Sequence, residues 1–168
     1  MVYVYTIKSI SPYSSSSNLS ESVYDMAKVG NTNRRVSLRE IAIHLFQEVK
    51  EQWTTDGEIS DGLMRDLLTV FPNSLFPALD LVDHKAVTRL KSTSGRCVYE
   101  VASVSEQSYS CLLEANFCPC SSFHYSVLSK DEAIMCKHLL AIHISVALDI
   151  VSHIGVTNRS LTESLDNM

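Results

Sequence analysis

The sequence predicts an α+β fold, in which N-terminal helices come first, a small antiparallel β-sheet follows and one long helix closes the main fold. Apolar residues recur at helical spacing over residues 37–85, whereas an alternating pattern dominates residues 86–104. Apolar residues then become dense again between positions 134 and 151. With 168 residues and 45% apolar content, the chain has material for one hydrophobic core, and a second full domain would not fit comfortably.

Little regular structure is expected at the two ends of the chain. Residues 1–36 predict a flexible tail, because a run of serines and scattered polar residues cannot bury enough apolar surface to offset the entropy of ordering. Residues 154–168 predict a short helix or tail, in which Ser160 and Glu163 have capping-box spacing. No run reaches the ~18 apolar residues that a bilayer-spanning helix needs, so we expect no membrane association.

Residues 37–85 form the expected helical region. Ser37 followed three positions later by Glu40 is a capping box, after which apolar residues recur at helical spacing up to Thr54. Shorter helices are expected after two further N-cap residues, which are Ser60 and Ser74.

Residues 86–153 are expected to contain a β-hairpin, a metal-binding segment and a helix. Residues 86–91 and 96–104 read as the two strands of the hairpin, because a Ser-Thr-Ser-Gly turn separates them. Residues 109–113 predict a third strand. This small sheet comes directly before the expected metal-binding segment.

The helix at the end of this region is expected to begin close to Cys136 and to run to about Val151. Its apolar residues cover nearly the whole circumference, and such a helix needs two buried faces. One face can cover the sheet. We therefore predict that part of the other face, including Ile144 and Leu148, binds a partner protein together with Trp53 of the first helix.

Four residues have the spacing of a tetrahedral zinc site: Cys118 and Cys120, then fifteen residues, then Cys136 and His138. Three thiolates and one neutral imidazole fill all four positions and leave none for a catalytic water. The sequence therefore predicts a structural Zn²⁺ site and a protein that is not an enzyme. Five cysteines, an odd number with two in a Cys-x-Cys pair, favour metal ligation over disulfides.

The local geometry of the four ligands can also be predicted. A sharp turn at Pro119 brings the sulfurs of Cys118 and Cys120 closer together than a regular strand would. Inside a helix, Cys136 and His138 would point about 200° apart. Cys136 must therefore lie at or before the first helical turn, where unpaired amides are expected to favour its thiolate form.

The remaining cysteines and histidines receive less specific interpretations. Cys97 and Cys111 lie on expected strands among apolar neighbours, where buried thiols are more common than metal ligands. His124 follows Cys120 by four residues and could compete as a ligand. The better interpretation is that it packs nearby or contacts a ligand without binding the metal itself. His143 belongs to the surface or the core of the last helix.

The ligand order Cys-x-Cys, fifteen residues, Cys-x-His resembles that of the SWIM zinc finger family. Further stretches are similar to the small SWIM-domain proteins of the Shu complex: ALDLVD at 78–83, SGRCVY at 94–99, FHYSVL at 123–128 and CKHLL at 136–140. This resemblance implies a zinc-bound SWIM finger that leads into the last helix. It also implies a nuclear factor of homologous recombination repair that pairs with a RecA-family recombinase paralogue and promotes recombinase assembly on single-stranded DNA.

Two other functions compete with this adaptor role. A zinc module that binds single-stranded DNA directly is disfavoured, because residues 86–140 contain five basic and five acidic residues and the whole chain has a formal charge of −5. We therefore expect DNA to be reached through the partner. A transposase-derived SWIM protein is disfavoured because the remaining length cannot hold a nuclease domain.

Enzymatic alternatives have weaker support. The sequence lacks the Gly-x4-Gly-Lys-Ser/Thr pattern of a phosphate-binding loop, so we expect no nucleotide to bind in that manner. A redox centre at Cys118 and Cys120 would require these thiols to react in the folded protein, whereas zinc ligation predicts their protection from alkylation.

Overall fold

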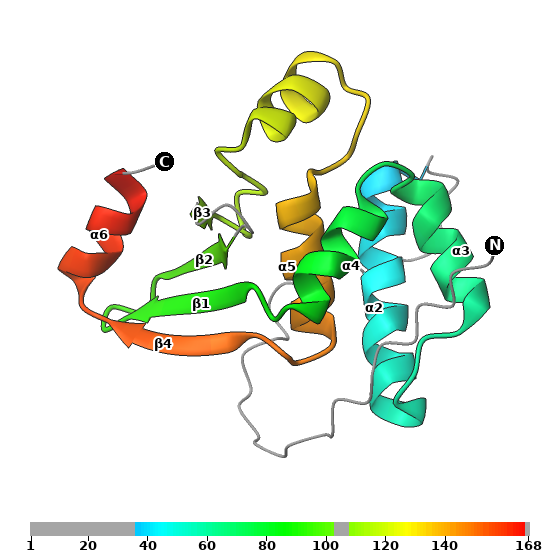
Figure 1. Cartoon of the computed structure of the whole chain (residues 1–168), viewed down its shortest axis with the longest axis horizontal. Helices are drawn as coiled ribbons and strands as arrows, with labels where there is room; N and C mark the ends of the chain where they lie inside the picture. Colours follow the sequence, from blue (N-terminus) through cyan, green and yellow to red (C-terminus); the bar gives the residue numbers. More distant parts are fainter. Residues whose placement is uncertain (1–35, 103–107, 167–168) are drawn as a thin grey trace.

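The computed structural model describes residues 36–102 and 108–166 of the chain (Figure 1). The predicted α+β class is confirmed, with helices before and after a small sheet. The expected tail at residues 1–36 lies outside the described residues, apart from Val36. Among the described helices, none combines the length and the apolar character that a membrane span requires.

The helical region follows the predicted N-cap residues closely. Helix α2 (Leu38–Asp56) begins at the complete Ser37–Glu40 capping box and ends at Gly57, whose φ of 71° is easily adopted by glycine. Helix α3 (Asp61–Val70) begins where the Ser60 hydroxyl accepts a hydrogen bond from an amide of the first turn.

Helix α4 (Leu75–Asp83) begins after Ser74, but that side chain does not cap the helix. The Ser74 hydroxyl instead donates to the carbonyl oxygen of Met135, at 3.2 Å. This contact joins the start of α4 to the segment just before the last long helix, which lies 61 residues further along the chain.

The sheet contains β1 (Val87–Ser92), β2 (Cys97–Ala102), β3 (Ser108–Cys111) and β4 (Ser152–Val156), in the order β3-β2-β1-β4. The β1–β2 and β2–β3 pairs are antiparallel, as expected for the hairpin and the third strand. Strand β4 was not predicted, and it pairs with β1 in parallel. The sheet is therefore mixed rather than wholly antiparallel.

The last long helix, α5 (Lys137–Ala147), begins as predicted but stops four residues before the expected end at Val151. Asp149 adopts a left-handed φ of 54°, and the chain then turns back along β1 as β4. The short strand has only a weak pattern of its own, so its partner in the sheet decides its structure.

Helix α6 (Asn158–Asp166) begins three residues earlier than the Ser160 cap predicts. The Thr157 hydroxyl accepts from the Ser160 amide, so Thr157 caps the helix and Ser160 lies within its first turn. Because Ser160 is not the N-cap residue, the expected capping box of Ser160 and Glu163 does not form, and the Glu163 carboxylate accepts a hydrogen bond from Arg159 at 3.1 Å.

Helix α5 lies at the centre of the main hydrophobic core. It lies between the sheet and helices α4 and α2 (Figure 1), and it contacts α2, α4, β1, β2 and β3. Its Leu139, Leu140 and Ile142 side chains are fully buried. A second, smaller core of Leu90, Val98 and Leu161 forms between the opposite face of the sheet and α6.

This arrangement corrects the position of the expected partner-binding stripe. Ile144 and Leu148 are only 3% and 2% exposed, because the chain's own helices and sheet cover both faces of α5. Trp53 is partly buried and packs against the same core. In this structure the side chains of Ile144 and Leu148 therefore offer no surface to a partner.

His143 of α5 contributes an aromatic contact to this core. Its imidazole stacks on the Phe46 ring at a centroid distance of 4.6 Å and an interplanar angle of 6°. Phe46 also stacks on Phe71, at 5.8 Å. Burial lowers the pKa of His143 to about 4, and its Nδ1 atom is buried without a hydrogen-bond partner among the described residues. His143 is therefore neutral near pH 7.

We expect His143 to make folding stability depend on pH. Its folded-state pKa of about 4 lies below the ordinary value of 6.5, so only the unfolded chain takes up a proton between these values. Its contribution to stability is fully present above pH 6.5 and falls by up to ~3 kcal/mol as the pH drops toward 4. Urea unfolding between pH 7 and 4.5 measures this slope.

The matched variant is His143→Phe, which keeps an aromatic ring against Phe46 and cannot bind a proton. Since metal ligands also lose affinity in acid, the difference between wild type and variant isolates the histidine. A variant whose stability has the same pH slope as wild type would contradict this role for His143.

Candidate metal centre

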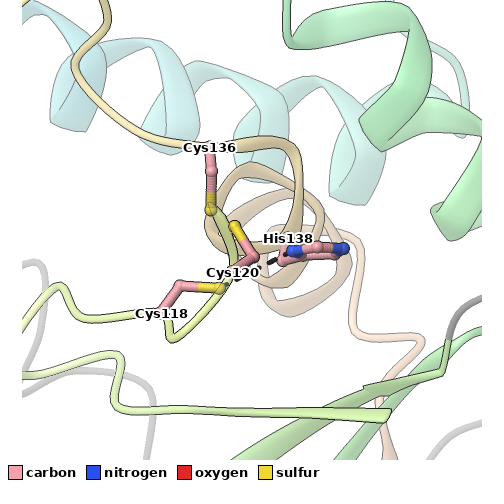
Figure 2. Close-up of side chains that lie close together, drawn as sticks. All are labelled: Cys118, Cys120, Cys136 and His138. Carbon is pink, nitrogen blue, oxygen red and sulfur yellow. Dashed lines mark hydrogen bonds between the residues drawn. The ribbon is translucent and has the colours of Figure 1, made fainter. Parts of the chain in front are cut away.

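The predicted ligands lie on two segments that the fold brings together. Cys118 and Cys120 follow a tight loop, which is closed by reciprocal backbone hydrogen bonds between Leu112 and Phe117. Cys136 is the N-cap residue of α5, and His138 lies in its first turn. Figure 2 shows the three sulfurs and the imidazole directed toward a common centre.

The distances between the ligand atoms fit a tetrahedral zinc ion. All four ligand atoms lie within 4.8 Å of one another, and Cys118 Sγ lies 3.6 Å from His138 Nδ1. Bonds of ~2.3 Å to sulfur and ~2.0 Å to nitrogen at a tetrahedral angle place such a sulfur–nitrogen pair about 3.5 Å apart. The four side chains are at most 4% exposed, so a buried and closed coordination shell fits here.

The orientation of the His138 ring is held by packing. Tyr109 of β3 stacks on the imidazole at a centroid distance of 4.4 Å and an interplanar angle of 25°. Nδ1 therefore faces the sulfur atoms, whereas Nε2 is buried without a hydrogen-bond partner among the described residues. This geometry assigns Nδ1 as the metal-binding nitrogen.

The three ligand thiols affect one another's protonation. Hydrogen bonds from Cys118 and Cys136, with the Phe123 amide at 3.3 Å, lower the pKa of Cys120. A hydrogen bond with Cys111, followed by one with Cys120, raises the pKa of Cys118. Three thiols this close cannot all ionise unless a cation offsets the repulsion between the thiolates.

At Cys136 the neighbouring thiols oppose the effect of the helix N-terminus, and its thiolate form in the metal-bound site stays a prediction. Hydrogen bonds with Cys118 and then Cys120 raise its pKa, while the Leu139 amide lowers it by a smaller amount. A divalent cation would supply the missing positive charge and ionise the remaining thiols. Metal binding at this site should therefore release protons.

Two residues outside the predicted ligand set also belong to the surroundings of the site. Cys111 is fully buried and raises the pKa of Cys118, and Tyr109 covers His138. Sequence reasoning missed both roles. The i, i+2 spacing of Tyr109 and Cys111 on one strand was a usable signal, because it places both side chains on the same face.

The other candidate residues lie outside the cluster. His124 is exposed and makes edge-to-face contacts with Phe117 and Phe123, so it packs rather than ligates. It belongs to the π-helix η2 (Phe123–Ser129), which occupies much of the spacer between the two ligand pairs. Cys97 is half-buried and accepts a hydrogen bond from Arg89 at 3.2 Å.

Comparison with known proteins identifies similar chains from several organisms. The chain is 39% identical over 130 residues to mouse (Mus musculus) "Zinc finger SWIM domain-containing protein 7", covering 77% of this chain and 86% of the relative. The human (Homo sapiens) protein of that name is 35% identical, covering 77% and 93%. A Dictyostelium discoideum homolog is 30% identical, covering 78% and 81%. No family model and no solved structure matches the chain.

We expect the purified chain to hold one zinc ion and Cys136→Ser to lose it. Structural zinc contributes an apparent ~10–16 kcal/mol of binding free energy, so losing a ligand should melt the segment around residues 118–138. Inductively coupled plasma mass spectrometry gives the zinc content, and circular dichroism reports the melting.

Cys97→Ser is the matched control, because Cys97 lies outside the cluster and should leave the zinc content unchanged. Alkylation adds a second readout. Cys118 and Cys120 should react with iodoacetamide only after a chelator is added. Rapid alkylation of these thiols in the folded, zinc-loaded protein would instead support a redox centre.

Proposed function

Because the chain belongs to the family of zinc finger SWIM domain-containing protein 7, we propose that it is a zinc-binding accessory subunit of a Shu-type complex. In this role it pairs with a RecA-family recombinase paralogue in the nucleus and promotes homologous recombination repair. The observation that carries the proposal is the buried cluster of three cysteines and one histidine in the ligand order of a SWIM finger.

A non-enzymatic role is supported by how the cluster is built. Cys118, Cys120, Cys136 and His138 can occupy all four positions of a tetrahedral ion, and they are nearly inaccessible to solvent. A substrate would have to displace a protein ligand in order to reach the metal. The ion's contribution in this proposal is therefore to hold two chain segments together.

The zinc site would also determine the arrangement of the elements that form a partner-binding surface. Its ligands join the loop after β3 to the first turn of α5. Helix α5 in turn contacts α2, α4 and three strands of the sheet. Loss of the ion would therefore disturb the packing of α5 against both the helices and the sheet. A partner that binds the folded subunit would then bind it more weakly.

DNA contact is assigned to the partner in this proposal. The formal charge of −5 gives the chain little attraction for phosphate, and residues 86–140 have balanced charges. The sequence also lacks a P-loop, so ATP-dependent steps would come from the recombinase paralogue. The subunit would act by stabilising or positioning its partner.

We expect a tagged full-length chain to co-purify a RecA-family paralogue from the nuclei of its own cells, as identified by mass spectrometry. Cys136→Ser should reduce recovery at least tenfold, because it removes the ion that holds α5 in place. Cys97→Ser should recover wild-type amounts.

Two outcomes would contradict the proposal. Recovery of the paralogue by Cys136→Ser at wild-type levels would show that zinc does not organise the binding surface. Tight, salt-dependent binding of the isolated zinc-loaded chain to fluorescent single-stranded DNA would favour the direct DNA-binding alternative instead.

A further inference from the structure

Strand β4 lies at one edge of the sheet and has a single neighbour, β1, among the described residues (Figure 1). Four of its five residues are exposed, and only Val156 is partly buried. An edge strand presents backbone N–H and C=O groups on its outer side, which can pair with another chain.

The sequence of β4 lacks the features that usually protect such an edge. Ser152–Val156 contains no proline, no lysine and no acidic residue. Gly155 lies within the strand, and a Cβ atom added there would meet nothing within 4 Å. A glycine inside a strand is typical of places where another backbone approaches closely.

One face of the β4 edge is apolar. Ile154 pairs in register with Leu90 and is 51% exposed, although Leu90 itself is buried beneath α6. Val156 packs against the same small core, which Leu90, Val98 and Leu161 form. An apolar side chain placed beside Ile154 would extend this core toward the open edge.

The other face of the edge carries positive charge. His153 pairs in register with Arg89, and Lys91 pairs with Gly155, which has no side chain to cover it. The Arg89 guanidinium lies over β2, where it donates to Cys97 Sγ and is 6.0 Å from the centre of the Tyr99 ring. Its Nε is buried without a hydrogen-bond partner among the described residues, and Lys91 is the cation nearer the β4 edge. Within the described part of the chain, no carboxylate forms an ion pair with Arg89 or Lys91.

We propose that the β4 edge binds an extended segment of a partner protein in which apolar and acidic residues alternate. The segment would add a fifth strand to the sheet, with backbone hydrogen bonds to β4. Its apolar side chains would lie beside Ile154, and its carboxylates would face Lys91 across Gly155. This inference holds for any partner with that pattern and does not rest on the recombination role.

A second copy of this chain fits the same edge poorly. Antiparallel pairing of two β4 strands would place the Arg89–Lys91 strips of both copies on the same face of the joint sheet. The second copy would bring no carboxylate toward Lys91, since its own β4 strand contains no acidic residue. Charge complementarity therefore favours a different, acidic partner over self-association.

The test uses the zinc-loaded full chain and two fluorescein-labelled peptides, Glu-Val-Glu-Val-Glu-Val-Glu and its counterpart with lysine at every glutamate. We expect the acidic peptide to bind, with protection of the 152–156 amides from hydrogen exchange, and the basic peptide to bind at least tenfold more weakly. Ile154→Lys should weaken binding of the acidic peptide about tenfold, and Lys91→Glu should also weaken it.

Leu128→Lys is the matched control, because Leu128 is 60% exposed on η2 and loses the same kind of apolar surface away from the sheet. It should bind the acidic peptide like wild type. The proposal is overturned if both peptides bind equally, if Ile154→Lys binds like wild type, or if protection appears outside residues 152–156. Sedimentation showing a dimer that Ile154→Lys dissociates would overturn it in favour of self-association.

Discussion

The cluster of three sulfurs and one imidazole is the constraint on which the rest of the structure depends. Its ligands come from a loop after β3 and from the first turn of α5, so the cluster determines where α5 begins and how it meets the sheet. Tyr109 holds the imidazole plane from the sheet side. Because α5 lies at the centre of the main core, the coordination geometry also positions the surfaces against which α2, α4 and three strands pack.

Electrostatics explains why the site should be occupied in the working protein. Cys118, Cys120 and Cys136 are buried close together, where three thiolates would repel one another strongly. A divalent ion removes the repulsion between thiolates and replaces hydrogen bonds that water cannot supply at a buried site. Folding and metal binding are therefore expected to be coupled, and the closed shell suits a structural ion rather than a catalytic one.

The sheet separates two surfaces with different roles. One face packs on α5 and the metal site, and the opposite face packs on α6 through the small core around Leu90. Burial of Ile144 and Leu148 removes the helix face that seemed available for a partner. Among the described residues the β4 edge is open, with exposed Ile154 on one face and Lys91, opposite Gly155, on the other. Partner recognition at a sheet edge would leave the metal-stabilised core undisturbed.

The sequence by itself determined the ligand set, the α+β class and the start of α5 at Cys136, because ligand spacing, N-cap residues and apolar periodicity are local signals. Only the tertiary structure decided the role of residues 152–156, since their strand forms by parallel pairing with β1, more than sixty positions earlier in the chain. It also decided the burial of Ile144 and Leu148. These properties depend on which distant side chains pack nearby, and a linear pattern does not encode that information.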